Sequence, residues 1–505
     1  MTVASDPQLA LNLIQRACVG DILTRNAERL PHKSALVDGA EELTYGELDR
    51  RANAIGRSLL ELGLERQEMV AILSRNSWEL VATYFACAKA GLIAQPINLG
   101  LKPEEIAYVL EETGARVLVV EGALADLAAA LPPVEHTFVT GDSFERLLEA
   151  DGSPLEVFVD DSDAVQCLHT SGTTSLPKGV LTSQLSVTIT ALSAVVQLRT
   201  GENDTTVIPL PLFHCAALNA ILISTLLAGG TAVLQPGYEV RGLIEALESR
   251  HATFALLLPL QWQDLLDQPD VRERDWSSLR LCVYGMAPMA AERVAELREV
   301  FGADALLGSG QTEFMPPTTF HRLENQYDKS ASWGPATPMT DVRIMDEEGH
   351  LQPRGEVGEI VYRGPHCMTR YLHNQEATEE AFRGGWFHSG DVGYLDEEGV
   401  VWFTDRKKDM VKTGGENVSS LEVERMLLAH PAVSEAAVVG LPDERWGECV
   451  TAFVIGSATE AELLAWCRER LAAFKAPKRI VLVEQLPRTG TGKIQKHLLR
   501  QLGAA

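Results

Sequence analysis

Short apolar runs alternate with segments of helical periodicity along most of the chain, and this alternation constrains the fold more than any other feature. The apolar run Met69–Leu73 precedes a helical segment at Trp78–Lys89, and the run Ile93–Ile97 precedes a helix opened by Pro103. Thr44 and Glu47 form a capping box at the start of an earlier amphipathic helix. Strands that alternate with helices form parallel sheets covered by helices. The sequence therefore predicts an α/β fold with parallel or mixed sheets wrapped by helices.

The pattern changes near Asp341, where strand-like runs become short and turns become frequent. Two Asp-Glu-Glu-Gly segments, at 346–349 and 396–399, are turn-forming sequences between such runs. Beyond Asp405 the chain has helical and strand patterns typical of a small α+β unit. We predict a large N-terminal domain over 1–404 with a β-rich subdomain over about 341–404, and a small mobile C-terminal domain over 405–505.

Composition excludes several classes of protein. The 505 residues carry a formal net charge of −26, and this acidity argues against non-specific binding to nucleic acid or to an anionic membrane. The eight cysteines contain no C-x-x-C pair, which favours free thiols in a reducing, cytoplasmic compartment. The start of the chain lacks the basic region of a signal peptide. The uncharged stretch 215–234 is interrupted by Asn219 and Gly229-Gly230, so we expect a buried helix and strand rather than an integral membrane segment.

The sharpest local motif is a loop rich in small and hydroxyl side chains that ends in a lysine. Its sequence is Thr170-Ser171-Gly172-Thr173-Thr174-Ser175-Leu176-Pro177-Lys178-Gly179. Small residues allow the backbone to approach a polyphosphate, hydroxyls donate to its oxygens, and the lysine neutralises charge. Pro177 precedes Lys178, so this is not a Walker A loop, which needs glycine at that position. From composition alone, a Ser/Thr-rich surface loop explains the segment equally well.

Four further motifs follow, and together with the loop they carry a resemblance to a known family. They are Gly310-Gln311-Thr312-Glu313, then 385–391 (GWFHSGD), then Asp405-Arg406-Lys407-Lys408-Asp409 with 412–417 (KTGGEN), and finally 487–493 (PRTGTGK). The set resembles, in order and spacing, the adenylate-forming superfamily of acyl-CoA synthetases, peptide-synthetase adenylation domains and luciferases, with acyl-CoA synthetases most similar. The resemblance covers residues from about Thr170 to Lys493.

The resemblance implies binding sites for ATP and Mg²⁺. Ser171, Thr173, Thr174 and Lys178 are then expected to hold the β- and γ-phosphates, Thr312 the α-phosphate, and Glu313 the metal ion. Asp391 is expected to accept hydrogen bonds from the ribose hydroxyls, and Arg406 to contact the ribose or a phosphate. The remaining nucleotide- or coenzyme-binding positions implied by the motifs are Thr170, Gly172, Ser309, Gly310, Gln311, Gly414 and Gly415.

A two-step reaction follows from the same resemblance. A carboxylate and Mg-ATP give an acyl-adenylate and pyrophosphate, and a thiol then displaces AMP. Lys493 is expected to bridge the two anions in the first transition state. Rotation about the hinge residue Asp405 is expected to remove Lys493 and to bring Gly414 and Gly415 to the thiol. The resemblance implies coenzyme A as the acceptor.

An acyl pocket is expected near four segments whose side chains are small or apolar. The resemblance implies that His214 borders the acyl group, and a histidine satisfied within the core is the less favoured alternative. The other predicted pocket residues are Tyr284, Gly285, Met286, Gly308 and Ser309. These segments contain no acidic residue to hold the ammonium group of an amino acid, so a fatty acid or an aryl carboxylate fits better, and the two fit about equally.

Three residues depart from the family pattern. Ser309 replaces a common aromatic residue, Ser175 a common glycine, and Ser420 a frequent proline.

Two other functions compete with that of a coenzyme A ligase. The first alternative is an adenylating enzyme that passes its acyl group to a carrier protein, an amine or nitrite. The second is a non-catalytic nucleotide-binding protein, against which Lys178, Glu313 and Lys493 argue.

Overall fold

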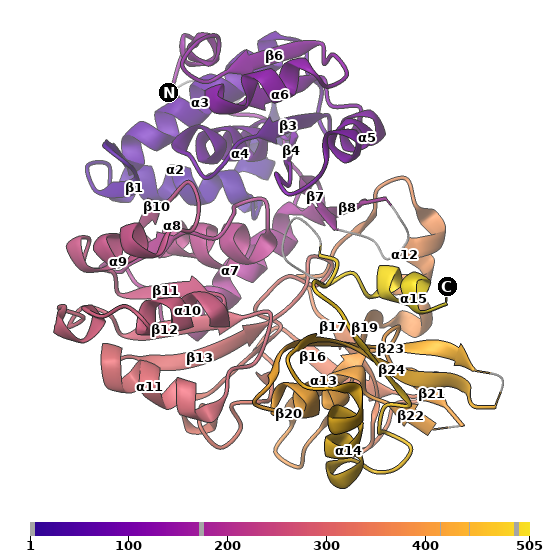
Figure 1. Ribbon diagram of the computed structural model, residues 1–505. Helices are drawn as coiled ribbons and strands as arrows, with labels where there is room; N and C mark the ends of the chain where they lie inside the picture. Colours follow the sequence, from indigo (N-terminus) through magenta and orange to yellow (C-terminus); the bar gives the residue numbers. More distant parts are fainter. Residues whose placement is uncertain (1–5, 171–175, 415, 444, 489–493, 505) are drawn as a thin grey trace. The chain divides into compact units, whose positions relative to one another are not determined.

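The computed structural model describes residues 6–170, 176–414, 416–443, 445–488 and 494–504, and Figure 1 traces the chain. Two compact units share it, the first made of Met1–Asp341 and Tyr362–Phe387, the second of Val342–Val361 and His388–Ala505. The chain therefore passes from one unit to the other three times, at 341/342, 361/362 and 387/388. The boundary predicted near Asp405, with a mobile C-terminal domain beyond it, stays a prediction.

Two sheets form the framework of the first unit. In strand order, one sheet contains β14 (Thr319–Phe320), β13 (Asp304–Ser309), β12 (Leu281–Gly285), β11 (Phe254–Leu257), β9 (Thr205–Ile208), β10 (Thr231–Leu234), β1 (Ser34–Asp38) and β2 (Glu41–Thr44). The other contains β18 (Arg370–Tyr371), β8 (Lys178–Ser183), β7 (Ala164–Thr170), β4 (Ile93–Pro96), β3 (Met69–Leu73), β5 (Val117–Val120) and β6 (His136–Val139). Pairing is parallel except at β2, β14, β8 and β18. The expectation of parallel and mixed sheets is confirmed.

Helices fill the space between these two sheets and cover their outer faces. They are α1 (Pro7–Gln15), α2 (Val19–Arg29), α3 (Tyr45–Glu61), α4 (Trp78–Ala90), α5 (Pro103–Thr113), α6 (Ala125–Ala129), α7 (Gln184–Leu198), α8 (Ser224–Ala228), α9 (Val240–Ser249), α10 (Pro259–Leu266), α11 (Ala291–Phe301) and α12 (Gln375–Ala381). The largest apolar core joins α2, α3, α4 and α7 to strands of both sheets. A second core packs α9, α10 and α11 on the first sheet, and a third packs α5 on the other.

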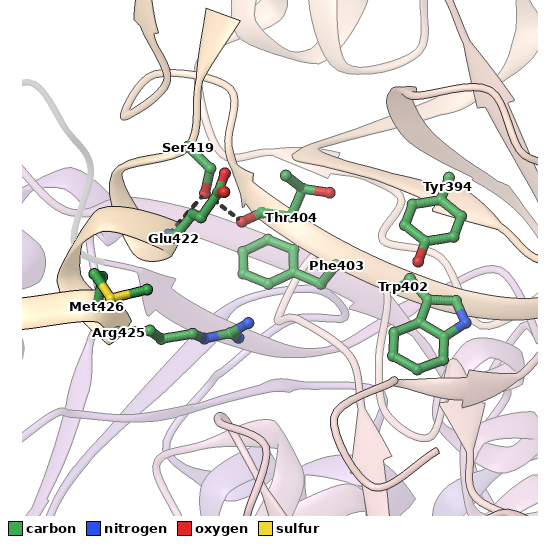
Figure 2. A pocket seen from close by; sticks show the side chains of 8 residues that line it. All are labelled: Tyr394, Trp402, Phe403, Thr404, Ser419, Glu422, Arg425 and Met426. Carbon is green, nitrogen blue, oxygen red and sulfur yellow. Dashed lines mark hydrogen bonds between the residues drawn. The ribbon is translucent and has the colours of Figure 1, made fainter. Parts of the chain in front are cut away.

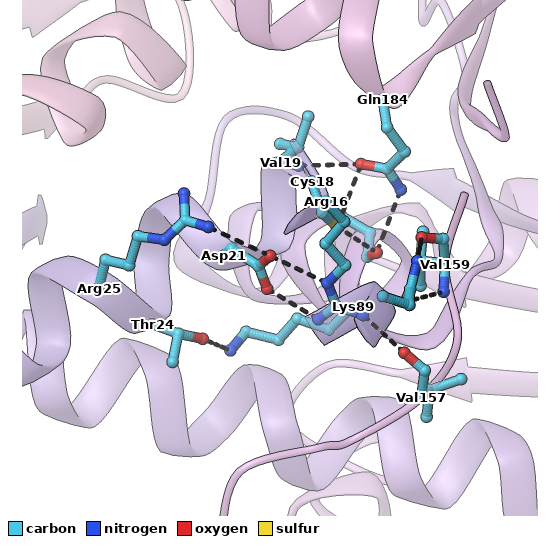
Figure 3. A network of polar contacts seen from close by, with 12 residues as sticks. Arg16, Cys18, Val19, Asp21, Thr24, Arg25, Lys89, Val157, Val159 and Gln184 are labelled. Atoms are coloured by element: carbon cyan, nitrogen blue, oxygen red, sulfur yellow. Dashed lines mark hydrogen bonds and ion pairs between the residues drawn. The ribbon is translucent and has the colours of Figure 1, made fainter. Parts of the chain in front are cut away.

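Three of these helices are tied together by a buried ion pair. Lys89 on α4 lies 2.6 Å from the carboxylate of Asp49 on α3, and both side chains are at most 10% exposed. The same ammonium group donates to the hydroxyl of Thr24 on α2 (Figure 3). Asn53 donates to the second oxygen of Asp49 at 2.9 Å. The pair is thus surrounded by hydrogen bonds, which is the condition under which a buried charge is tolerated.

The uncharged stretch 215–234 folds as a buried helical segment followed by a strand, as predicted. Ala216–Ile223 is a π-helix that continues into α8, and the strand is β10. Among the described residues, no helix combines the length and the apolar character needed to cross a membrane. A π-helix is rare, and such segments are frequent at functional sites.

The second unit consists of two small sheets and three helices. One sheet holds β16 (Asp341–Met345), β17 (Gly358–Arg363), β19 (Phe387–Leu395) and β20 (Val400–Arg406). The other holds β21 (Val411–Thr413), β22 (Glu416–Val418), β23 (Val433–Asp443), β24 (Gly447–Gly456) and β25 (Arg479–Leu482). The helices are α13 (Ser420–Leu428), α14 (Glu460–Arg470) and α15 (Lys496–Ala504). The α+β character predicted for residues beyond Asp405 agrees with this arrangement.

Candidate active site

The predicted phosphate loop joins two antiparallel strands of the first unit. Thr170 ends β7 and Lys178 begins β8, and the two residues are paired across the ladder. Gly179 is closely packed, because a Cβ there would lie 3.0 Å from the Cys167 thiol and from Leu372. The hairpin therefore fixes both ends of the loop. Residues 171–175, with the predicted phosphate contacts of Ser171, Gly172, Thr173 and Thr174, lie outside the described residues.

Lys178 and Glu313 come from different motifs, and Tyr371 contacts both. The Lys178 ammonium lies 5.2 Å from the centre of the Tyr371 ring, within the range of a cation–π interaction. The Tyr371 hydroxyl donates to the Glu313 carboxylate at 3.1 Å. Burial, and then the neighbouring Glu313 carboxylate, raise the pKa of Tyr371 well above its usual range, so the hydroxyl keeps its proton. Sequence reasoning missed Tyr371, since its partners are distant in the chain.

A tight turn presents Thr312 and Glu313. Its ends are held by reciprocal backbone hydrogen bonds between Gln311 and Phe314, both at 3.2 Å. Gly310 is required at the start, because a Cβ there would lie 2.6 Å from the Cα of Pro316. The backbone N–H of Met368 donates to the carbonyl of Glu313 at 2.8 Å. The turn thus has little freedom, and the predicted metal ligand projects from a rigid backbone.

A buried thiol lies beside the turn as a second feature that the sequence did not reveal. Cys215 donates to the Thr312 hydroxyl, with 3.9 Å between sulfur and oxygen. Burial raises the pKa of the Cys215 thiol to about 12, so the group is a neutral donor and not a nucleophile. Its position directly before the π-helix links that segment to Thr312.

Magnesium binding fits the charge of this region. Within the part of the chain that the structure describes, no three His, Cys, Asp or Glu side chains are grouped to hold a metal ion. Mg²⁺ commonly takes one or two carboxylates from the protein and further oxygens from substrate phosphates. The half-buried Glu313 carboxylate suits that pattern, because Tyr371 connects it to Lys178 at the C-terminal end of the predicted phosphate loop.

The predicted acyl-pocket residues lie at the carboxyl ends of two neighbouring parallel strands. Gly285 ends β12 and is paired with Gly308 in β13. A Cβ on Gly285 would lie 3.1 Å from the Gly308 carbonyl oxygen, so glycine keeps these backbones close. Met286 follows with φ +67° and a side chain that is 64% exposed. A non-glycine residue in this left-handed conformation is strained, and such strain clusters at functional sites.

Tyr284, Ser309 and His214 show three different environments. Tyr284 belongs to β12 and is fully buried in the core, with its ring edge-on to His321. The Ser309 hydroxyl is 2.6 Å from that of Thr319, which donates to the Trp333 carbonyl. His214 is half-buried and packs edge-on to Phe213 with 4.8 Å between the ring centres. The pocket roles of all three stay predictions.

In the second unit, the two residues predicted to contact the ribose form an ion pair. Asp391 on β19 is paired in register with Arg406 on β20, and the Arg406 Nε lies 2.9 Å from the Asp391 carboxylate. Asp391 is 3% exposed, whereas the Arg406 side chain is 47% exposed. The guanidinium thus presents its outer face to solvent while holding the buried carboxylate in place.

The predicted hinge residue is enclosed by hydrogen bonds. Asp405 is 1% exposed, and its Oδ2 accepts from the backbone N–H and the hydroxyl of Ser420 at 2.5 and 2.8 Å. Lys496 donates to the Ser420 hydroxyl at 2.6 Å and lies 2.8 Å from the Glu424 carboxylate. Burial raises the pKa of Glu424, although Lys496 opposes the shift. Ser420, one of the three residues that depart from the family pattern, therefore connects Asp405 to α13 and α15.

Replacing Ser420 with proline gives a direct test of this restraint. Position 420 is the first of α13, where proline is tolerated, but proline has no N–H or hydroxyl to donate to Asp405. We expect amide hydrogen exchange at Arg406, whose N–H donates to the other Asp405 oxygen at 2.7 Å, to rise about tenfold or more, since hydrogen bonds to charged groups contribute about 1.5–3 kcal/mol each. Ser420→Ala, which keeps the backbone bond, should show a smaller rise. Wild-type exchange at Arg406 in the proline variant would contradict the restraint.

A pocket of about 430 Å³ lies beside the predicted hinge residue, between β20 and α13 (Figure 2). Its lining residues are Tyr394, Trp402, Phe403, Thr404, Ser419, Glu422, Arg425 and Met426. None of these is a predicted site residue.

Gly414, a predicted coenzyme position, has φ +60°, and its N–H donates to the Trp446 carbonyl at 2.8 Å. Gly415 and Lys493 lie outside the described residues.

Comparisons with known proteins identify the family. The model of the AMP-binding enzyme family matches residues 23–372, and that of the AMP-binding enzyme C-terminal domain matches 422–493. A feruloyl-CoA synthase of Amycolatopsis sp is 36% identical over 96% of this chain and 98% of its own length. A long-chain-fatty-acid–CoA ligase of Mycobacterium tuberculosis is 32% identical over 96% of this chain and 98% of its own. The crystal structure of an anthranilate CoA ligase with anthranoyl-AMP has a TM-score of 0.87 and 31% identity, covering 97% of this chain and 99% of the other.

These matches extend over nearly the whole chain. They confirm the predicted adenylate-forming fold and the prediction of an AMP-forming acid–thiol ligase. The chain belongs to the AMP-binding enzyme family, the adenylate-forming superfamily that its five motifs indicated, and its relatives within that family are acyl-CoA synthetases.

Proposed function

We propose that this enzyme activates an aryl or arylalkenyl carboxylate with Mg-ATP and transfers the acyl group from the adenylate to coenzyme A. The observation that carries the proposal is that Tyr371 contacts both Lys178 and Glu313, next to the point where the predicted phosphate loop enters β8. A cation at this point can bind a polyphosphate, and a carboxylate can bind its metal ion. The family membership supplies the reaction type.

We assign each predicted residue a role in the first step. Lys178 binds phosphate oxygens, and Glu313 binds the magnesium ion, whose role when present is to neutralise the polyphosphate. Asp391 and Arg406 hold the ribose, with Arg406 orienting the buried carboxylate. Lys493 stabilises the charge that builds as the carboxylate attacks the α-phosphate.

The aryl class is favoured by the strand ends and by the relatives. Open parallel sheets bind ligands beyond the carboxyl ends of their strands, where Gly285, Met286 and Gly308 lie. Gly285 and Gly308 add no side chains there, and the Phe320 ring lies 3.1 Å from the position of a Cβ on Gly308, so an aromatic surface borders these strand ends. The relatives include enzymes named for feruloyl and anthranilate substrates. A long-chain fatty acid is the second candidate, because a ligase for such acids is 32% identical.

Coenzyme A is favoured as the acceptor because the relatives named above are coenzyme A ligases. The alternative acceptors are a free carrier protein, an amine or nitrite. The enclosed Asp405 carboxylate lies where a rotation between the two steps would pivot, and Gly414 begins the segment expected to approach the thiol. We also propose that the enzyme works in the cytoplasm, in keeping with eight free cysteines.

A substrate panel tests the proposed acid. Pyrophosphate exchange is measured with ferulate, 4-coumarate, benzoate, anthranilate, hexanoate and palmitate, and coenzyme A is then added to follow AMP release. We expect the highest kcat/KM with an aromatic acid, by about tenfold or more over either alkanoate, because a pocket shaped for a rigid flat ring packs poorly against an alkyl chain, which also loses rotational freedom on binding. Preference for palmitate would replace the aryl proposal by the fatty-acid one. Exchange without coenzyme A-dependent release of AMP would redirect the search to another acceptor.

A further inference from the structure

Tyr371 lies where three parts of the first unit meet. It belongs to β18, which pairs antiparallel with β8, with Tyr371 opposite Val180. Its own N–H donates to Thr378 on α12 at 3.1 Å, and the next residue, Leu372, donates to the Gly179 carbonyl at 2.7 Å. The backbone of Tyr371 is thus held on both sides.

The segment around Tyr371 also holds the turn that carries Glu313. The backbone N–H of Met368 donates to the Glu313 carbonyl at 2.8 Å. The neighbouring residue, Cys367, forms an isolated antiparallel β-bridge with Phe314. The same short segment therefore contacts both the backbone and the side chain of Glu313 while pairing with the strand that begins at Lys178.

Two contacts then converge on one half-buried side chain. The Tyr371 hydroxyl donates to one oxygen of the Glu313 carboxylate at 3.1 Å, which leaves the second oxygen for another partner. The face of the ring lies 5.2 Å from the Lys178 ammonium. A ring in this position attracts the cation through its quadrupole, while it removes none of the ammonium donors.

We propose that Tyr371 is a positioning residue that aligns the metal-binding carboxylate through its hydroxyl and the phosphate-binding lysine through its ring. The inference rests on the proposed function, because Lys178 and Glu313 take their roles from it. Tyr371 itself performs no bond-making step. It orients Glu313 for the magnesium ion and Lys178 for the polyphosphate before either ligand arrives.

Two substitutions separate the two contributions. Tyr371→Phe keeps the ring beneath Lys178 and removes the hydrogen bond to Glu313. Tyr371→Leu removes both. The matched control is Tyr108→Phe, since the Tyr108 hydroxyl donates to Glu112 at 3.0 Å in a pair of the same kind on α5.

The readouts are binding measurements made without turnover. Affinity for ATP in the presence of EDTA is measured by calorimetry, and affinity for Mn²⁺ in the presence of a non-hydrolysable ATP analogue by electron paramagnetic resonance. We expect Tyr371→Phe to bind metal-free ATP within about twofold of the wild type and to weaken Mn²⁺ binding about tenfold or more. We expect Tyr371→Leu to weaken Mn²⁺ binding equally and ATP binding by a further 2- to 30-fold or so. Tyr108→Phe should change neither.

The outcomes distinguish this inference from the function on which it rests. If Tyr371→Phe binds Mn²⁺ as the control does, the hydroxyl has no positioning role, and if Tyr371→Leu binds metal-free ATP as tightly as the wild type, the ring has none. Should the leucine variant fail to fold, Tyr371→Met, closer to tyrosine in length, takes its place. Wild-type enzyme that binds neither ATP nor Mn²⁺ would overturn the proposed function itself.

Discussion

Replacing Lys493 with alanine is expected to lower the rate of adenylate formation by about 100- to 1,000-fold, which is the usual effect of removing one group that stabilises charge in a transition state. The attack of a thiol on the adenylate needs no bridge between two anions, so that step should fall by less than about tenfold. The measurement is single-turnover formation of the acyl-adenylate from acid and ATP, compared with release of AMP from chemically prepared adenylate and coenzyme A.

Lys475, another lysine of the C-terminal part of the chain, gives the control. Lys475 pairs with Glu422 at 2.8 Å, and Lys475→Ala should form the adenylate at close to the wild-type rate. Equal losses in both half-reactions of Lys493→Ala would contradict a lysine that acts only in the first step. An unchanged rate of adenylate formation would show that Lys493 is an ordinary solvated lysine.

Removing the carboxylate of Asp49 is expected to destabilise the first unit by about 3–5 kcal/mol, the usual cost of leaving one member of a buried ion pair without its partner. The Lys89 ammonium would remain 4% exposed, with only Thr24 as its described hydrogen-bond acceptor. We expect the midpoint of urea unfolding of Asp49→Ala, followed by tryptophan fluorescence, to fall accordingly.

Two further variants show whether burial of the charge is the cause. The double variant Asp49→Leu with Lys89→Met removes both charges and keeps the volume, so it should recover most of the loss. Glu41→Ala removes a partner of Arg51 in a pair whose Glu41 side chain is 48% exposed, and it should cost at most about 1 kcal/mol. A loss in Glu41→Ala as large as in Asp49→Ala would exclude the buried charge as the explanation.

Local sequence signals predicted the elements of the fold well. The capping box at Thr44 and Glu47 is formed as expected, and the segment predicted at Trp78–Lys89 is a helix ending one residue later. Both features depend on residues within a few positions of one another. The π-helical geometry of Ala216–Ile223 was not predicted, because an apolar run without charges has no periodicity that separates it from an α-helix.

Contacts between distant segments explain what the sequence did not reveal about the site. Tyr371 contacts Lys178 and Glu313 because β18 pairs with β8. A strand of two residues has no local sequence pattern from which it could be predicted. The enclosure of Asp405 by Ser420 and Lys496 likewise depends on packing of α13 and α15. The motif residues were recognisable because the resemblance named them, whereas the residues that orient them were not.

The fate of the carboxylate oxygens tests the proposed reaction most directly. The aromatic acid preferred in the panel is labelled with ¹⁸O in its carboxylate and is incubated with the enzyme, Mg-ATP and coenzyme A, and the products are analysed by mass spectrometry. Attack of the carboxylate on the α-phosphate transfers one labelled oxygen to each AMP and leaves pyrophosphate unlabelled. Label in pyrophosphate or in inorganic phosphate, or unlabelled AMP formed alongside the thioester, would contradict an acyl-adenylate intermediate.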